Sequence, residues 1–355
     1  NRKKRSNFAE LIIDYMELKT YPIHKLDGNI TAILQTIISA DIPGCINKGL
    51  SNEIHFIDEG TSITDSAKIV PDILNGGYYV QLSAAYCQYL WLICDIALKS
   101  IDFETISYEC GKRGLDLNDY KAFLEEFISL PKEMALEKLQ KSGYNINPAQ
   151  YYDYIKRSPS IIDIERLKKE LEMDYCLLLP LADKSKAIDI EKYYQINFGG
   201  AYEEKVNAMY CYGITFVLLH ELSHFSLGHL NKTIEEESDE IEADIAAFWN
   251  IYSSLTGPQL FSANCGLLCV LFSFIFLNPN LSIDEKDNHP REDKRLFEIY
   301  DNIKDDNEKF ELLIIHMFRL WKDFNDIQDF PELKNGNLED TINSIKEFLS
   351  SYNPN

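Results

Sequence analysis

A histidine pair at the end of an apolar run most restricts how this chain can fold. Residues 220–224 read HELSH and follow the apolar residues 214–219, which predicts a helix over residues 202–227 that Gly228 ends. Residues four apart share one face of a helix, so His220 and His224 can direct ring nitrogens at one Zn²⁺. Glu221 lies about 100° further round, where its carboxylate can take a proton from a water that the metal acidifies.

A third metal ligand is predicted in the next helical pattern, sixteen residues after His224. Glu240 and Asp244 are again four apart and therefore share a face. Glu240 would complete a site of two histidines and one carboxylate, and Asp244 would accept the far N–H of a ligand histidine. Taken alone, the acidic residues 235–242 indicate a helix N-terminus that complements the helix dipole. Their position after the histidine pair favours the metal site.

These patterns together resemble the gluzincin zinc metallopeptidases. The likeness comprises HELSH at 220–224, EIEAD at 240–244 and a stretch beginning His289-Pro290 that places Arg295 like the arginine of an HPxxxxR motif. Within that class the chain looks like the Lit-type phage-exclusion peptidases and the group of HtpX and the CAAX proteases. The likeness covers about residues 206–300. It implies a zincin-like catalytic domain with one Zn²⁺ per chain.

Three further residues are candidates for the surroundings of the metal. The resemblance places His289 near it, where the imidazole could stabilise the oxyanion; the alternative is a structural residue before Pro290. Arg295 is expected to hold a carboxylate of the scaffold. His229 would be about 140° out of line with His224 on a continuous helix. It could be a ligand only if the helix breaks at Gly228, and is otherwise expected to support the ligands or to be structural.

The leading hypothesis is a soluble zinc endopeptidase that cleaves a protein substrate. The substrate would add as a strand to an exposed sheet edge formed by Tyr78, Tyr79, Val80, Gln81 and Leu82. The Lit-type resemblance implies cleavage of a host protein during a bacterial anti-phage response, set off by an activating trigger or partner. The alternative is a regulatory or sensing protein that keeps the zincin fold and acts by binding. Glu221 counts against it, because structural zinc sites need no general base.

Composition restricts the partners and the compartment. The formal net charge of −22 argues against binding to nucleic acid or to an anionic membrane surface. The eight cysteines form no CxxC pair, which favours buried thiols in a reducing cytoplasm. The longest apolar stretch, residues 265–277, is shorter than the about 20 residues of a spanning helix and predicts a buried core helix. With no visible signal peptide, we expect a cytoplasmic protein without a membrane anchor.

The pattern of elements predicts a mostly helical α+β fold with a small antiparallel sheet. Three parts are expected: an N-terminal part with an edge strand (1–111), a helical insertion (112–174) and the catalytic zincin domain with C-terminal helices (175–355). Strands are predicted at 53–57 and 78–82, and further extended segments at 175–181 and 188–197. Besides those around the motifs, helices are predicted at 8–18, 30–39, 84–99, 120–129 with Asn118 as the cap, 132–141, 149–156, 161–173, 309–324 and 338–350.

Overall fold

The computed structural model describes most of the chain. The described residues are 26–45, 49–57, 66–113, 116–141, 167–172, 174, 178, 203–232, 237–278, 281, 290–303, 308–331 and 337–352. The predicted segments 8–18, 149–156 and 188–197 lie outside them, as do residues 161–166 and all of 175–181 except Leu178. Residues 167–172, Asp174 and Leu178 are helical; an extended conformation was expected for Leu178.

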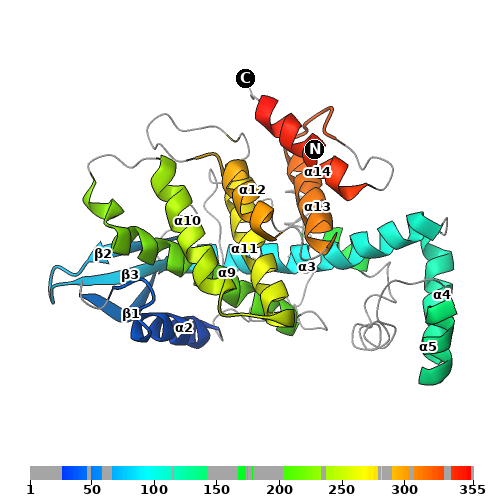
Figure 1. The fold of residues 1–355 in the computed structure, drawn as a ribbon, viewed down its shortest axis with the longest axis horizontal. Coiled ribbons are helices and arrows are strands. Elements are labelled where there is room, and N and C mark those ends of the chain that lie inside the picture. Colours follow the sequence, from blue (N-terminus) through cyan, green and yellow to red (C-terminus); the bar gives the residue numbers. More distant parts are fainter. Residues whose placement is uncertain are drawn as a thin grey trace, which may run out of the picture.

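The described chain is mostly helical with one small sheet, as predicted, but the sheet is mixed rather than antiparallel (Figure 1). Its strands are β1 (Leu50–Ile57), β2 (Ala67–Pro71) and β3 (Tyr78–Ser83), in the order β1-β3-β2. β3 pairs parallel with β1 and antiparallel with β2. The prediction that residues 78–82 form an edge strand is therefore wrong. β2, which the prediction missed, lies at one edge.

A tight turn joins β2 to β3. The Asp72 carboxylate accepts the backbone N–H groups of Leu74 and Asn75. Gly77 follows with φ of 89°, and a Cβ there would lie 2.4 Å from the carbonyl oxygen of Gly49. Only glycine fits that conformation and that approach. The alternating pattern of β3 then buries Val80 and Leu82.

Helices pack around and beyond this sheet. α2 (Asp27–Ser39) packs against β1, and α3 (Ala84–Arg113) contacts α9 (Glu203–Leu227), α11 (Gly257–Leu277) and α13 (Glu308–Phe324). α3 is longer than the predicted segment 84–99. The remaining helices of the main body are α10 (Glu237–Tyr252), α12 (Glu292–Ile303), α14 (Leu338–Ser351) and the short 3-10 turn η4 (His229–Asn231).

Two glycines bring α9 and α11 unusually close together. A Cβ on Gly266 of α11 would lie 2.3 Å from the carbonyl oxygen of Met209 on α9, and Gly213 of α9 faces the Gly266 carbonyl oxygen. Side chains larger than hydrogen would force the helices apart. The helix that carries the HELSH motif, α9, therefore packs directly against the backbone of α11.

α11 is the apolar core helix that the sequence predicts, although it begins at Gly257 rather than near residue 265. Thr256 stands at its N-cap position and Pro258 in its first turn, which suits a helix start. By length and composition α11 could cross a bilayer, the one such helix among the described residues. In this fold 78% of its most apolar 18-residue stretch is buried inside the protein.

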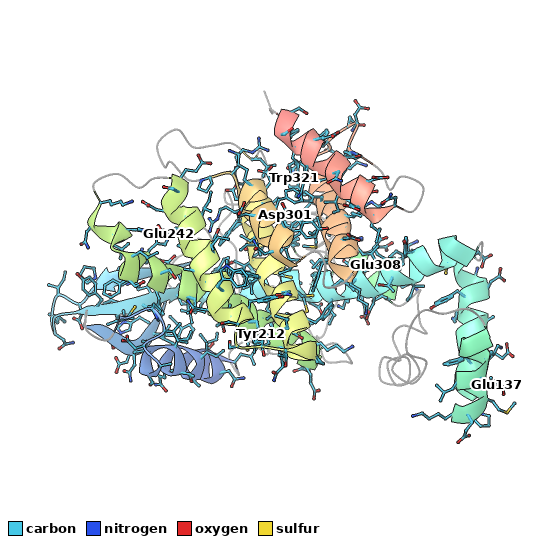
Figure 2. The ribbon with its side chains drawn as sticks, in the orientation of Figure 1. Glu137, Tyr212, Glu242, Asp301, Glu308 and Trp321 are labelled. Carbon is cyan, nitrogen blue, oxygen red and sulfur yellow. The ribbon has the colours of Figure 1, made fainter. Side chains whose placement is uncertain are left out.

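At the other end of α3 two helices project from the main body as an arm, α4 (Leu117–Ser129) and α5 (Lys132–Lys141) (Figure 1). Asp116 caps α4 by accepting the N–H of Asp119; this corrects the predicted cap at Asn118. Figure 2 shows Glu137 at the outer part of this arm and Trp321 among the side chains between α13 and α14. Trp321 is fully buried and packs edge-on against Tyr352.

Candidate metal centre

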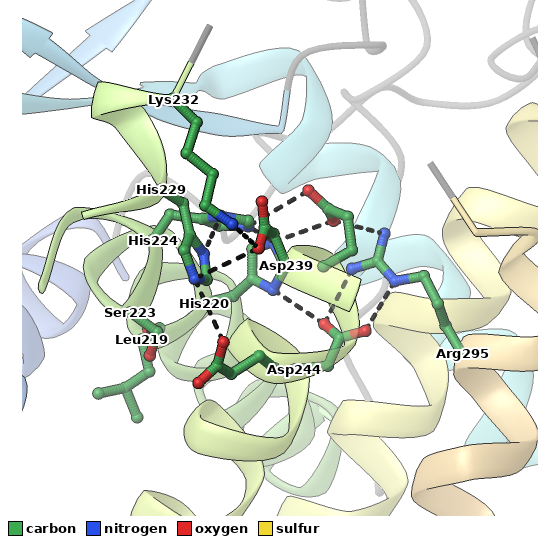
Figure 3. A network of polar contacts seen from close by, with 11 residues as sticks. Leu219, His220, Ser223, His224, His229, Lys232, Asp239, Asp244 and Arg295 are labelled. Carbon is green, nitrogen blue, oxygen red and sulfur yellow. Dashed lines mark hydrogen bonds and ion pairs between the residues drawn. The ribbon is translucent and has the colours of Figure 1, made fainter. Parts of the chain in front are cut away.

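Two adjacent helices bring the three predicted ligands together. His220 and His224 come from α9 (Figure 3). Glu240 comes from the first turn of α10, which packs against α9. The Nε2 atoms of the two histidines lie 3.0 Å apart. Oε1 of Glu240 lies 3.2 Å from Nε2 of His224, and Oε2 lies 3.5 Å from Nε2 of His220. All three side chains are buried.

These separations fit a single metal ion. Ligand atoms on a tetrahedral ion with bonds of about 2.0–2.1 Å are about 3.3 Å apart. The two histidine nitrogens, 3.0 Å apart, and the nearest Glu240 oxygen to each of them, at 3.2 Å (Oε1 to His224) and 3.5 Å (Oε2 to His220), have separations around that value. Two ring nitrogens and a carboxylate oxygen also form a donor set of the kind that holds such an ion in hydrolases. The residues therefore fit the metal that the motif implies.

The far side of His220 faces a carboxylate that an arginine holds in place. Nδ1 of His220 lies 2.8 Å from Oδ1 of Asp244, although its N–H does not point straight at that oxygen. Arg295 from α12 donates to both Asp244 oxygens, from Nε at 2.7 Å and from Nη2 at 2.8 Å. Its Nη1 lies 3.2 Å from Oε2 of Glu240. Arg295 thus binds two carboxylates of the site, in line with the predicted scaffold role.

The charges around this pair shift two pKa values in opposite directions. Burial alone would raise the pKa of Asp244, but the Arg295 guanidinium and His220 together outweigh burial and lower that pKa. Burial alone would lower the pKa of His220, but the Asp244 and Glu240 carboxylates together outweigh burial and raise that pKa to about 9. Asp244 is therefore held as an anion beside the ring of His220.

The far side of His224 faces another histidine. α9 ends at Leu227, as predicted, and Gly228 takes the left-handed conformation with φ of 83°. The chain then turns back, so that Nδ1 of the buried His229 lies 3.0 Å from Nδ1 of His224. Nε2 of His229 faces Glu242 at 3.4 Å and Asp239 at 3.7 Å. Because the helix does end at Gly228, His229 can approach a ligand that a continuous helix would keep from it.

Glu221 lies between the two histidines in sequence and is the residue for which the sequence predicts proton transfer. Burial raises its pKa, and the neighbouring His220 and His224 only partly offset this effect. A carboxylate whose pKa is raised towards neutrality both accepts and releases a proton more readily at physiological pH.

The remaining predicted site residues are His289 and the residues from Tyr78 to Leu82. His289 lies outside the described residues. The residues from Tyr78 to Leu82 lie in the central strand, where neighbours on both sides occupy the backbone hydrogen bonds that an added strand would need. Tyr78 instead packs its ring against Phe225 of α9, with centroids 4.8 Å apart.

Two residues of the site escaped prediction. Lys232 donates to Oδ1 of Asp239 at 2.6 Å, and Asp239 is buried beside His229. Asp239 could have been found from the sequence, since it immediately precedes the predicted ligand Glu240. Lys232 follows η4 in a short connection and has no sequence pattern of its own.

The comparisons with known proteins bear on the same segment. No curated protein and no solved structure matches the chain significantly. A family model described as Peptidase U49 matches residues 80–317, which is more than half of the 355 residues and includes every predicted ligand. The matched segment includes the candidate metal site of two histidines and a glutamate. This chain belongs to the Peptidase U49 family of Lit-type metallopeptidases.

Proposed function

We propose that this metallopeptidase is a zinc-dependent endopeptidase. The observation that carries the proposal is the convergence of His220, His224 and Glu240 within bonding distance of one ion, with Glu221 next to them on α9. A zinc ion held there would supply an acidified water and polarise the scissile carbonyl. Glu221 then takes the proton of the attacking water and passes it to the leaving amine.

The substrate is expected to bind in an extended form along β2. Among the described residues β2 pairs only with β3, so its other side offers backbone groups to an incoming strand. β2 also contacts α9, the helix that carries the histidines. This arrangement supports docking beside the metal, in place of the residue 78–82 edge expected from sequence.

The biological setting is a further part of the proposal. Membership of a Lit-type family supports a cytoplasmic role in which a trigger releases cleavage of a host protein during phage defence. The competing possibility is a protein that acts by binding alone. Glu221 favours the enzyme, because binding needs no general base beside the metal.

A glutamine at position 221 tests the proposal. Glu221→Gln keeps size and shape, so zinc content and melting temperature should stay near wild type while cleavage is lost. Cleaved protein termini should be compared across cells that express wild type, Glu221→Gln or the matched variant Glu237→Gln, which changes an exposed glutamate on α10. Toxicity that persists in Glu221→Gln without the cleaved termini would show that the protein acts by binding. Cleaved termini that persist would refute the role of Glu221 as the base.

A further inference from the structure

The two ligand histidines have different partners behind them. His220 is backed by the Asp244 carboxylate, whereas His224 is backed by another imidazole, that of His229 (Figure 3). A ligand histidine commonly donates its other N–H to a carboxylate, a backbone carbonyl or water. An imidazole in that place is therefore the unusual feature of this centre.

The geometry at His224 determines where each proton lies. Nε2 of His224 faces Glu240 and His220, so a metal there takes its lone pair and leaves the proton on Nδ1. That N–H points at Nδ1 of His229, 3.0 Å away, which must then be the acceptor. The proton of His229 consequently lies on Nε2, the atom that faces Asp239 and Glu242.

The surroundings of His229 stabilise this tautomer. Both groups that face its Nε2 are carboxylates, which accept a proton donor and would repel a lone pair. Lys232 holds Asp239 through a 2.6 Å contact, and Gly228 sets the turn that brings His229 back to α9. His229 itself is buried, so water does not compete for its Nδ1.

A second metal ion is the rival interpretation, since His229, Asp239 and Glu242 could also hold a cation. Two observations argue against it. The ammonium of Lys232 already lies against Oδ1 of Asp239, and the Glu242 side chain is 60% exposed. A second ion would also need a lone pair on Nε2 of His229, which would put the proton on Nδ1, opposite the N–H of His224.

We propose that His229 is a positioning residue for the peptidase reaction. By accepting at Nδ1, it fixes the tautomer and the ring orientation of the ligand His224, and Asp239 with Lys232 fixes His229. The inference rests on the proposed zinc site. It assigns His229 no contact with the substrate, and its effect reaches the reaction through the metal.

Two substitutions at position 229 separate this role from packing. His229→Leu keeps much of the volume and removes the acceptor. His229→Asn places an amide oxygen at nearly the same position as Nδ1 and so keeps it. In a competition with a chelator, His229→Leu should weaken zinc affinity about 10–100-fold, and His229→Asn should recover most of that loss. The Co²⁺-substituted protein should show altered d–d bands in the leucine variant only. On a cleavable substrate, the leucine variant at saturating zinc should lower kcat with little change in KM.

The control is His55→Gln, which changes an exposed histidine of β1 and should leave zinc affinity unchanged. Equal zinc affinity in wild type and His229→Leu would overturn the inference, and so would equal losses in the leucine and asparagine variants. Two zinc ions per wild-type chain, reduced to one by either variant, would favour the rival site and overturn it as well. Wild type that binds no zinc would instead refute the proposed function, so the two failures are distinguishable.

Discussion

The contact between α9 and α11 makes Gly266→Ala the most informative perturbation of this fold. The added methyl group would lie 2.3 Å from the carbonyl oxygen of Met209, whereas ordinary contacts begin near 3.4 Å. The obstacle is backbone and cannot rotate away. The two helices must therefore separate locally by about 1 Å.

The magnitude follows from two opposing terms. Overpacking of this kind costs about 1–3 kcal/mol, and replacing glycine by alanine within a helix returns up to about 1 kcal/mol. We expect a net loss of about 1–2 kcal/mol in the free energy of unfolding. His220 lies two helical turns beyond Gly213, about 10 Å along the same face, so the displacement is carried to a metal ligand. Because metal–ligand distances tolerate only about 0.2 Å, zinc affinity should fall by about tenfold or more.

Urea unfolding of the metal-free protein and zinc competition with a chelator measure the two effects separately. Gly28→Ala is the matched control, because a Cβ at Gly28 of α2 meets nothing within 4 Å. That variant should be as stable as wild type or more so by up to about 1 kcal/mol. If Gly266→Ala unfolds at the same urea concentration and binds zinc as tightly as wild type, the close approach does not set the position of α9.

Two further predictions concern buried charges on α3. Lys99 lies 2.7 Å from both Asp95 and Asp174, and all three side chains are buried. Lys99→Met should therefore lower the free energy of unfolding in urea by about 3–5 kcal/mol, because it leaves two carboxylates without their cation. A decrease below about 1 kcal/mol would contradict this prediction. Burial alone would raise the pKa of Glu104, but the hydrogen bond and charge of His316, together with the charge of Arg319, outweigh burial and lower that pKa below 4.5. The Glu104 contribution is thus present above about pH 4.5 and lost as the pH falls through the lowered value. Glu104→Gln should cost about 1 kcal/mol at pH 7, and a pH series in which this difference persists at pH 3 would refute the assignment.

The candidate metal centre was largely predictable because its residues lie at short intervals along the sequence. Four-residue intervals on α9 and α10 place His220, His224, Glu240 and Asp244 on defined helix faces whatever the rest of the fold does. The packing of α9 against α10 then needs only the apolar residues between them. The sequence could not show that Arg295 would donate from Nε and Nη2 to the two Asp244 oxygens, because 51 residues separate Arg295 from Asp244.

The sheet was harder to predict because its pairing is not local. β1 lies parallel to β3 although β2 comes between them in the sequence, and no pattern within the strands shows this order. β2 itself is five residues long and ends in Pro71, which weakens its strand signal. His229 was expected to support the ligands or to be structural, and the turn at Gly228 places it beside His224.

The burial of the thiols also has a consequence for metal selectivity. Seven described cysteines are free and six of them are buried, among them Cys45, whose Sγ donates to the Leu222 carbonyl between the two ligand histidines in sequence. Burial raises the pKa of Cys87 to about 12 and of Cys211 to about 11. At neutral pH such thiols are almost entirely protonated, and only the thiolate is a good ligand for soft metals. In the described part of the chain, the thiols whose pKa burial raises are therefore poor ligands for copper(I) or cadmium, and the candidate site presents imidazole and carboxylate donors to borderline metals.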